Sequence, residues 1–223
     1  MKRRILKVLI TILAVLLSVL LLTVLVTAVI NMVKSSHELR VLHELGYYNP
    51  VNTGDHCLNT ARFGNRSGKH TIVALSGLGL GDYSVTWRKM TSYLESNDQI
   101  VFIDRAGYGL SDDTDDVMTL DYIVEDYRKA LQNGGFAAPY ILMAHSIGGA
   151  YITYWESKYP EEVEAVVFVD GSQLSADAFE GLDKGEVTFR DRLSALLAKT
   201  GFGRYVIRNY YPVYGSNYNE EDQ

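Results

Sequence analysis

The sequence predicts an α/β fold in which helices cover both faces of a mostly parallel sheet, preceded by one N-terminal transmembrane helix. Three observations carry this prediction. Residues 8 to 33 are uncharged and mostly apolar, strand-like and helix-like segments alternate after residue 71, and a glycine-rich turn follows each of three strands. Such alternation is typical of a parallel sheet that is buried on both faces.

The apolar run at positions 8 to 33 predicts the transmembrane helix. As an α-helix it would be about 39 Å long at ~1.5 Å per residue, which exceeds a bilayer core of about 30 Å. A cleaved signal peptide is the alternative, but its apolar region is usually about 7 to 15 residues and ends at a small-x-small site. A buried core helix would show a polar stripe. We therefore expect a retained anchor.

The charges that flank the run predict its orientation. Lys2, Arg3, Arg4 and Lys7 precede it, whereas Lys34 and Arg40 follow it among the acidic residues Glu38 and Glu44. The positive-inside rule then places the N-terminus in the cytoplasm and the remainder outside it. Without the five basic residues of positions 1 to 35, the chain carries 16 basic and 27 acidic residues, a net charge of −11. Nucleic acid and anionic membrane surfaces are therefore not expected partners of this domain.

The composition fits one globular domain behind this anchor. The chain has 223 residues, of which 47% are hydrophobic and 22% charged, enough for one sizeable core. Cys57 is the only cysteine, so no internal disulfide can form. The expected boundaries are 1–7 for a basic tail, 8–33 for the anchor, 34–50 for a juxtamembrane connector, 51–172 for the α/β core and 173–223 for a partial cap or lid.

Local patterns predict the elements of the core in order. Strands are expected at 59–63 and 71–75, joined as a β-hairpin by the turn at 64–68. The later expected elements are helices at 87–94, 120–131 and 150–158, and strands at 100–103, 140–143 and 165–169. Residues 188–200 predict an amphipathic helix that either packs against the domain or forms part of a lid.

The first glycine-rich turn, residues 75 to 81, follows a strand at the edge where open α/β sheets place their ligand sites. A dinucleotide fingerprint is the alternative interpretation, because Asp104 ends the next strand and would be placed to bind a ribose. That fingerprint requires glycine at position 82, which is Asp82. The dinucleotide interpretation is therefore disfavoured.

Two further turns complete a pattern. Asp104-Arg-Ala-Gly-Tyr-Gly-Leu-Ser111 closes the second strand, and Met143-Ala-His-Ser-Ile-Gly-Gly149 joins the third strand to a helix. The third turn has small residues, Ala144 and Gly148, two positions before and after Ser146, as a strained nucleophile elbow requires. A structural serine is the alternative for this turn alone. With all three turns in this order, the chain resembles the α/β-hydrolase superfamily.

This resemblance covers residues of roughly 55 to 200 and implies an eight-stranded sheet with a serine, an acid and a histidine in that order. It assigns Ser146 as the nucleophile and the backbone N–H groups of Ile147 and Leu78 as oxyanion donors. Asp170 ends the strand after the elbow and is a candidate acid, with a plain turn residue as the alternative. Ser76 stands where many members have a histidine.

The histidine that this resemblance implies is missing. None of the five histidines, at positions 37, 43, 56, 70 and 145, follows Ser146, and the adjacent His145 is expected to be packed or hydrogen-bonded. Without a base the serine is a weak nucleophile. Because the last two strands are missing too, residues 166 to 169 would form an apolar sheet edge. We expect a chain shortened by a frameshift, an early stop or cloning, with a degenerate relative as the alternative.

The motifs therefore predict cofactor-free acyl transfer, with no metal site. The expected substrate is a small-molecule or lipid-like ester, less favourably an amide, and the expected membrane contact is the N-terminal helix. The activity of this chain is expected to be weak or absent. The alternative function is a membrane-anchored binding or interaction protein that retains the fold without the chemistry.

Overall fold

The computed structural model describes residues 2–79, 81, 83–172 and 188–201. By contacts the chain divides into two compact units, one of residues 40–182 and the other of residues 1–39 with 183–223, and each is described by itself. The first unit holds the sheet and the last residues of helix α1, 40–44, and the second holds the rest of α1 and the short helix α5.

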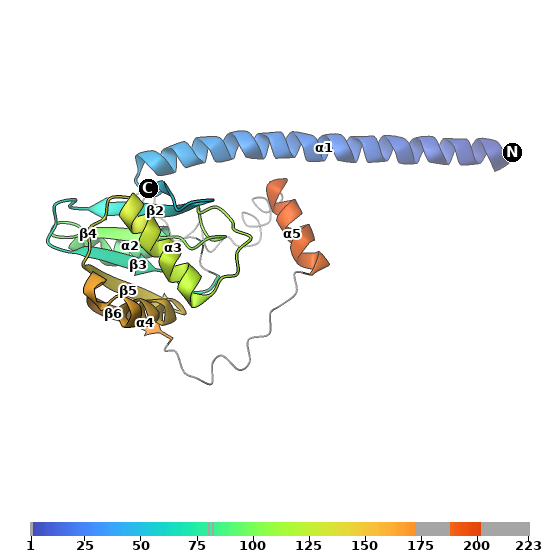
Figure 1. Ribbon diagram of the computed structural model, residues 1–223. Coiled ribbons are helices and arrows are strands. Elements are labelled where there is room, and N and C mark those ends of the chain that lie inside the picture. Colours follow the sequence, from blue (N-terminus) through green and yellow to red (C-terminus); the bar gives the residue numbers. More distant parts are fainter. Residues whose placement is uncertain (1, 80, 82, 173–187, 202–223) are drawn as a thin grey trace. The chain divides into compact units, whose positions relative to one another are not determined.

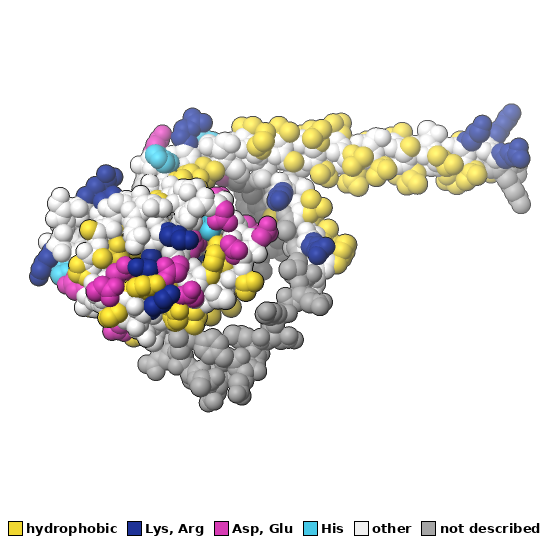
Figure 2. Space-filling model, viewed as in Figure 1, with side chains coloured by type: hydrophobic (Ala, Val, Ile, Leu, Met, Phe, Trp, Pro, Cys, Tyr) yellow, Lys and Arg dark blue, Asp and Glu magenta, His cyan; other side chains and the backbone are white. Residues whose placement is uncertain are grey.

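Helix α1 runs from Lys2 to Glu44, so the expected connector is helical through most of its length. It is followed by Gly46, whose positive φ of 83° allows a Schellman turn at the end of the helix. In that turn Gly46 N–H donates to the carbonyl of His43, and Tyr47 N–H donates to the carbonyl of Leu42. Apolar side chains cover most of α1, and Figure 2 shows a cluster of basic residues at its N-terminal end. By length and composition this helix fits a membrane span or a signal sequence.

The α/β unit contains one six-stranded sheet with the strand order β1-β2-β4-β3-β5-β6 (Figure 1). Strands β3 to β6 are parallel to one another, and β1 and β2 are antiparallel to their neighbours. The strands are β1 Pro50–Asn52, β2 Cys57–Gly64, β3 Thr71–Leu75, β4 Gln99–Ile103, β5 Tyr140–Ser146 and β6 Val163–Gly171. The predicted mostly parallel sheet is confirmed.

Helices cover both faces of this sheet, as predicted. The helices are α2 Tyr83–Thr91, α3 Leu120–Asn133 and α4 Gly148–Lys158, with 3₁₀ turns at Ser92–Leu94 and Pro160–Glu162. One core lies between the sheet and helices α3 and α4, where Tyr127 and Trp155 are fully buried. The other lies on the opposite face, where Tyr83 of α2 packs against Phe102. Successive residues of β3, β4 and β5 alternate between the two cores because their side chains point to opposite faces.

The predicted hairpin of residues 59–63 and 71–75 is wrong. Strand β2 pairs antiparallel with β4, and β3 pairs parallel with β4 and β5, so β4 lies between the two supposed partners. The turn after β2 is held by the segment before β4, since Asn65 N–H donates to the carbonyls of Glu95 and Asp98. These bonds hold the start of β4 beside the end of β2, in the position that β3 would occupy in a hairpin.

Strand β6 lies at the edge of the sheet formed by the described residues, and Val167 and Phe168 are more than two-fifths exposed there. The predicted apolar edge at residues 166–169 is therefore confirmed. The predicted helix at 188–200 is observed as α5, Phe189–Lys199, in the other unit. Most of the proposed cap, residues 173–187 and 202–223, lies outside the described residues.

Candidate active site

Ser146 lies where β5 ends, and α4 begins two residues later at Gly148. Its φ is +50°, in the left-handed region that a residue with a side chain rarely occupies. Such strain is maintained only where the surroundings impose it, and it clusters at functional sites. The local geometry is the sharp strand–turn–helix that the motif predicts, with Ser146 at its apex.

The tight packing around this turn explains its small residues. A Cβ atom on Gly148 would lie 3.1 Å from the carbonyl oxygen of Leu75 and 3.1 Å from the Cβ of Ala144. Both distances are tighter than normal van der Waals contact, and Ala144 is itself fully buried. A larger side chain at either position would therefore push β3 and β5 apart or displace the start of α4.

The first glycine-rich turn lies directly against the elbow. A Cβ atom on Gly77 would lie 2.8 Å from Nδ1 of His145 and 3.1 Å from the Cβ of Ser146. Leu78 comes next, in a turn, with its side chain 68% exposed. Ile147 is the N-cap residue of α4, and the first N–H groups of a helix have no partner within it. The two segments expected to supply oxyanion donors therefore flank Ser146, and the donor roles of Ile147 and Leu78 remain proposals.

Asp170 lies at the end of the neighbouring strand, in a bulge. The register between β5 and β6 shifts there, so that His145 faces Val169 and Ser146 faces Gly171. Asp170 is the extra residue, with φ of +50°, and it is exposed. A bulge re-aims side chains at a strand end. The structure therefore places Asp170 in a bulge near the end of β6, and its acid role remains a proposal.

The histidines have other partners. The ring of His145 packs against Trp87 in a tilted arrangement with 5.3 Å between centroids, in agreement with the expectation that it is packed. His56 Nε2 lies 2.9 Å from Asp126. His70 lies 2.9 Å from Glu164, at the N-terminal ends of the parallel strands and away from Ser146. His37 and His43 belong to α1. Among the described residues, no histidine nitrogen is hydrogen-bonded to Ser146.

The second glycine-rich turn is organised by Asp104. Its buried carboxylate accepts hydrogen bonds from Asn59 Nδ2 and the amide of Leu110, each at 3.0 Å. Gly109 approaches so closely that a Cβ there would lie 2.3 Å from the same carboxylate. The Asp104 carboxylate thus holds its own turn together. Because its oxygens already accept these hydrogen bonds, the dinucleotide interpretation, in which Asp104 would bind a ribose, is disfavoured.

Sequence reasoning did not predict the burial of two polar residues of this region, Arg105 and Ser76. Arg105 is 3% exposed, donates to the hydroxyl of Tyr151 at 3.2 Å, and stacks its guanidinium 4.0 Å from the ring centre of Tyr108. Ser76 Oγ and His145 Nδ1 are buried and have no hydrogen-bond partner among the described residues. An arginine in a glycine-rich turn gives no sequence signal of burial, because such turns are usually exposed.

Comparison with known proteins agrees with this fold. YbdG of Bacillus subtilis (strain 168) is 36% identical over 148 residues, which are 63% of this chain and 43% of YbdG. A chloroplastic protein of Arabidopsis thaliana with the provisional name methylesterase 14 is 32% identical over 106 residues, 47% of this chain and 30% of that protein. The chain thus spans less than half the length of these relatives.

The crystal structure of lip1 of Acinetobacter baumannii AYE, provisionally named a lipase, superposes with a TM-score of 0.53 at 19% identity. It covers 73% of this chain and 52% of that one. This likeness supports the fold alone. The family model described as the alpha/beta hydrolase fold matches residues 71–217, well over half of the chain. The chain therefore belongs to the α/β-hydrolase fold family.

Proposed function

We propose that the protein is a membrane-anchored serine hydrolase of the α/β-hydrolase fold that acts on esters. The observation that carries the proposal is the positive φ of Ser146 at the end of β5, with the glycine-rich turn of Gly77 packed against it. A strained serine at the carboxyl edge of a parallel sheet is the arrangement that presents a nucleophile. The names of two similar proteins, a methylesterase and a lipase, favour esters over amides.

In this proposal Ser146 Oγ attacks the ester carbonyl, and the N–H groups of Ile147 and Leu78 bind the developing oxyanion. The alcohol then leaves, and water releases the acid from the acyl-Ser146 intermediate. Asp170 is the candidate acid of the triad. The reaction needs a base to take the proton of Ser146, and in a comparable triad loss of the histidine lowers turnover by about 10⁶. Because no histidine follows Ser146 in the sequence, we expect the present chain to be weakly active or inactive.

The second candidate is a non-catalytic binding or interaction protein that retains the hydrolase fold and the anchor. It is favoured by one observation, that the nearest histidine in sequence, His145, is packed on Trp87 instead of bonded to Ser146. A longer gene that continues beyond residue 223 with an aspartate and a histidine would favour the enzyme. A gene that ends there would favour binding.

For the membrane we propose a single span formed by residues 8–33, with the N-terminus cytoplasmic and the α/β unit outside the cytoplasm. The support is the apolar surface of α1 and the basic residues at its start (Figure 2). Persistence of the full chain in the membrane fraction after an alkaline carbonate wash would support a retained span. Its release as a shortened protein would support a cleaved signal instead.

The catalytic proposal is tested by labelling the full chain, in neutral detergent, with a fluorescent fluorophosphonate. Ser146→Ala is the test variant, and Ser172→Ala is the matched control, because it removes a neighbouring hydroxyl but keeps the backbone. Labelling of the native chain and the control, absent in Ser146→Ala, would establish Ser146 as the nucleophile. Equal labelling of all three would contradict the mechanism. No labelling of a folded native chain would mean that the missing histidine is decisive, and would point to a longer gene or to the binding protein.

A further inference from the structure

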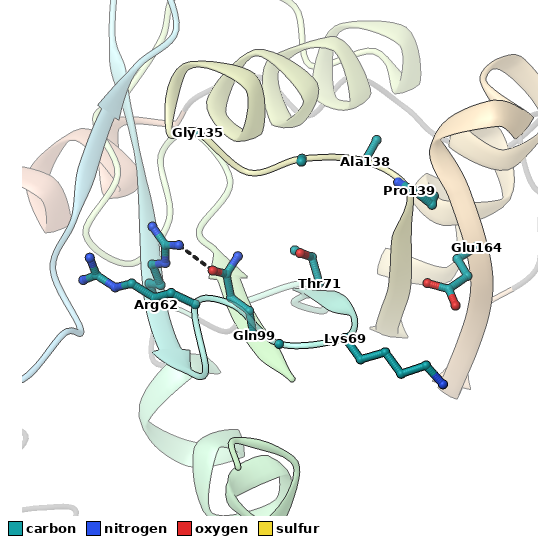
Figure 3. Close-up of a pocket in the computed structure, with 11 residues that line it drawn as sticks. Arg62, Lys69, Thr71, Gln99, Gly135, Ala138, Pro139 and Glu164 are labelled. Atoms are coloured by element: carbon teal, nitrogen blue, oxygen red, sulfur yellow. Dashed lines mark hydrogen bonds between the residues drawn. The ribbon is translucent and has the colours of Figure 1, made fainter. Parts of the chain in front are cut away.

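A basic hollow lies at the N-terminal ends of the parallel strands, whereas Ser146 lies at the C-terminal end of β5. Its volume is about 310 Å³, and its charged lining residues are Arg62, Arg66, Lys69 and Glu164. Figure 3 shows Arg62 and Gln99 on one side of it and Glu164 on the other, with Lys69 reaching across below. Three cationic side chains therefore share one small space in a unit that is acidic overall.

The positive charge of this hollow is not neutralised by the described residues. Arg62 donates to the neutral side chain of Gln99, and its Nε is buried without an acceptor. No carboxylate of the described residues forms a salt bridge with Arg62, Arg66 or Lys69. Glu164 is paired with His70 at 2.9 Å. Burial, and then the like charge of Arg66, lower the pKa of Arg62, so the two guanidinium groups repel each other as they stand.

A bound anion would remove this repulsion. A guanidinium donates in a planar fork to phosphate oxygens, and an ammonium adds a compact point charge. The hydroxyl of Thr71 also lines the space. A phosphate group offers several acceptor oxygens to donors that approach from different sides, whereas a carboxylate offers two. The volume exceeds that of a bare ion and fits a phosphate with a small attached group.

A second hollow suggests where the phosphate comes from. It has a volume of about 400 Å³, shares Arg62 and Arg66 with the first, and is also lined by His43 and Gly46, where α1 ends. The apolar run ends at Val33, ten residues before His43, or about 15 Å along a helix. The two arginines therefore adjoin the segment that leaves the proposed membrane span.

We propose that Arg62, Arg66 and Lys69 form a phosphate-binding site, and that its natural occupant is the headgroup of an anionic phospholipid. Phosphate binding is independent of the proposed hydrolase activity, whereas the lipid source depends on the proposed membrane anchoring. Anionic lipids attract basic residues near a membrane surface, so this site would hold the α/β unit close to the bilayer.

The test uses the full chain in neutral detergent and three probes, each followed by microscale thermophoresis. The probes are inorganic phosphate, dihexanoyl phosphatidic acid and dihexanoyl phosphatidylcholine, in which choline neutralises the phosphate. The test variant is Arg66→Gln with Lys69→Gln, which leaves the bond of Arg62 to Gln99 in place. The matched control, Lys89→Gln with Lys129→Gln, removes two exposed lysines from α2 and α3. We expect saturable binding of phosphatidic acid that weakens about tenfold or more in the test variant alone.

The outcomes separate the parts of the proposal. Tighter binding of phosphatidic acid than of inorganic phosphate, lost in the test variant, supports the lipid headgroup. Equal binding of the two supports the phosphate site and overturns the lipid source. Binding that is absent, or equal in the test variant and the native chain, overturns the proposal. Ser146→Ala should leave phosphate binding unchanged, so a failure of the hydrolase mechanism would not be mistaken for a failure of this site.

Discussion

The backbone N–H of Ser172 donates a hydrogen bond of 2.7 Å to the carbonyl oxygen of Ser146. This bond joins the end of β6 to the turn that presents the candidate nucleophile. Gly149, in the first turn of α4, packs against the same segment. The conformation of Ser146 therefore depends on the strand beside it as well as on its own turn.

Gly149→Ala should destabilise the α/β unit, because its Cβ would lie 2.6 Å from the carbonyl oxygen of Ser172, where backbone must move. Overpacking of this kind costs about 1 to 3 kcal/mol. Gly148→Ala is the graded control, since its nearest neighbour is at 3.1 Å, and it should cost less. Urea unfolding of both variants measures the difference. If Gly149→Ala lowers the free energy of unfolding no more than Gly148→Ala does, the segment around Ser172 moves without a loss of stability.

Ser76→Ala should stabilise the protein. The Ser76 hydroxyl is buried without a partner, and a buried polar group left unpaired costs about 1 to 3 kcal/mol. The contrasting variant is Thr60→Val, which keeps the shape but removes a hydroxyl that bonds to Asn49 at 2.9 and 3.0 Å. That variant should lose stability. The free energies of unfolding of both variants, measured in urea, test the expected gain and the expected loss of stability. A loss of stability in Ser76→Ala would mean that the Ser76 hydroxyl has a partner in solution.

The stability of the α/β unit should fall as the pH rises through neutrality, owing to His56. This buried ring lies between Asp55 and Asp126, each 2.9 Å away, with Thr53 also in contact. Burial opposes the charge, but the hydrogen bonds of the two carboxylates outweigh it and raise the pKa of His56 above its usual 6.5. A raised pKa in the folded state stabilises the protein fully below the unfolded pKa, and this stabilisation is lost as the pH rises through the folded pKa.

His56→Gln should remove this contribution, whose slope is at most about 1.4 kcal/mol per pH unit. Urea unfolding between pH 6 and pH 9 measures it as the difference between native and variant protein. His43→Gln, an exposed histidine of α1, is the control and should leave the slope unchanged. If the native chain and His56→Gln show the same pH dependence, the pKa of His56 is the same in the folded and the unfolded protein.

Arg128→Lys should destabilise the junction between α3 and the turn before β6. Arg128 donates to both oxygens of Glu162 at 2.8 and 2.6 Å and also to Glu125 at 2.8 Å. A lysine ammonium cannot form this bidentate pair, and the loss should be about 1 to 2 kcal/mol. Lys129→Arg, at the exposed neighbouring position, is the control that should change little. Thermal unfolding compares them, and equal midpoints would show that the pair is screened by solvent.

Several features of the protein were determined by sequence alone. The alternation of apolar strands and amphipathic helices predicts the layered fold, because each pattern has only one way to bury its apolar side. The small residues around Ser146 predict the elbow, because the motif encodes a local backbone shape that few residues tolerate. The apolar surface of α1 is equally a local property. These predictions needed no knowledge of which strands are neighbours.

The tertiary structure decided what depends on residues far apart in the chain. Strand β4 separates β2 from β3, although β2 and β3 are joined by a short turn, because pairing is settled by the whole sheet. No local pattern in the sequence gives Glu162 a partner, whereas the fold bonds it to Arg128. The same holds for the burial of Arg105 and for the basic hollow around Arg62. Local patterns set the conformation of a segment, but partners, burial and shared charge arise only when distant segments pack together.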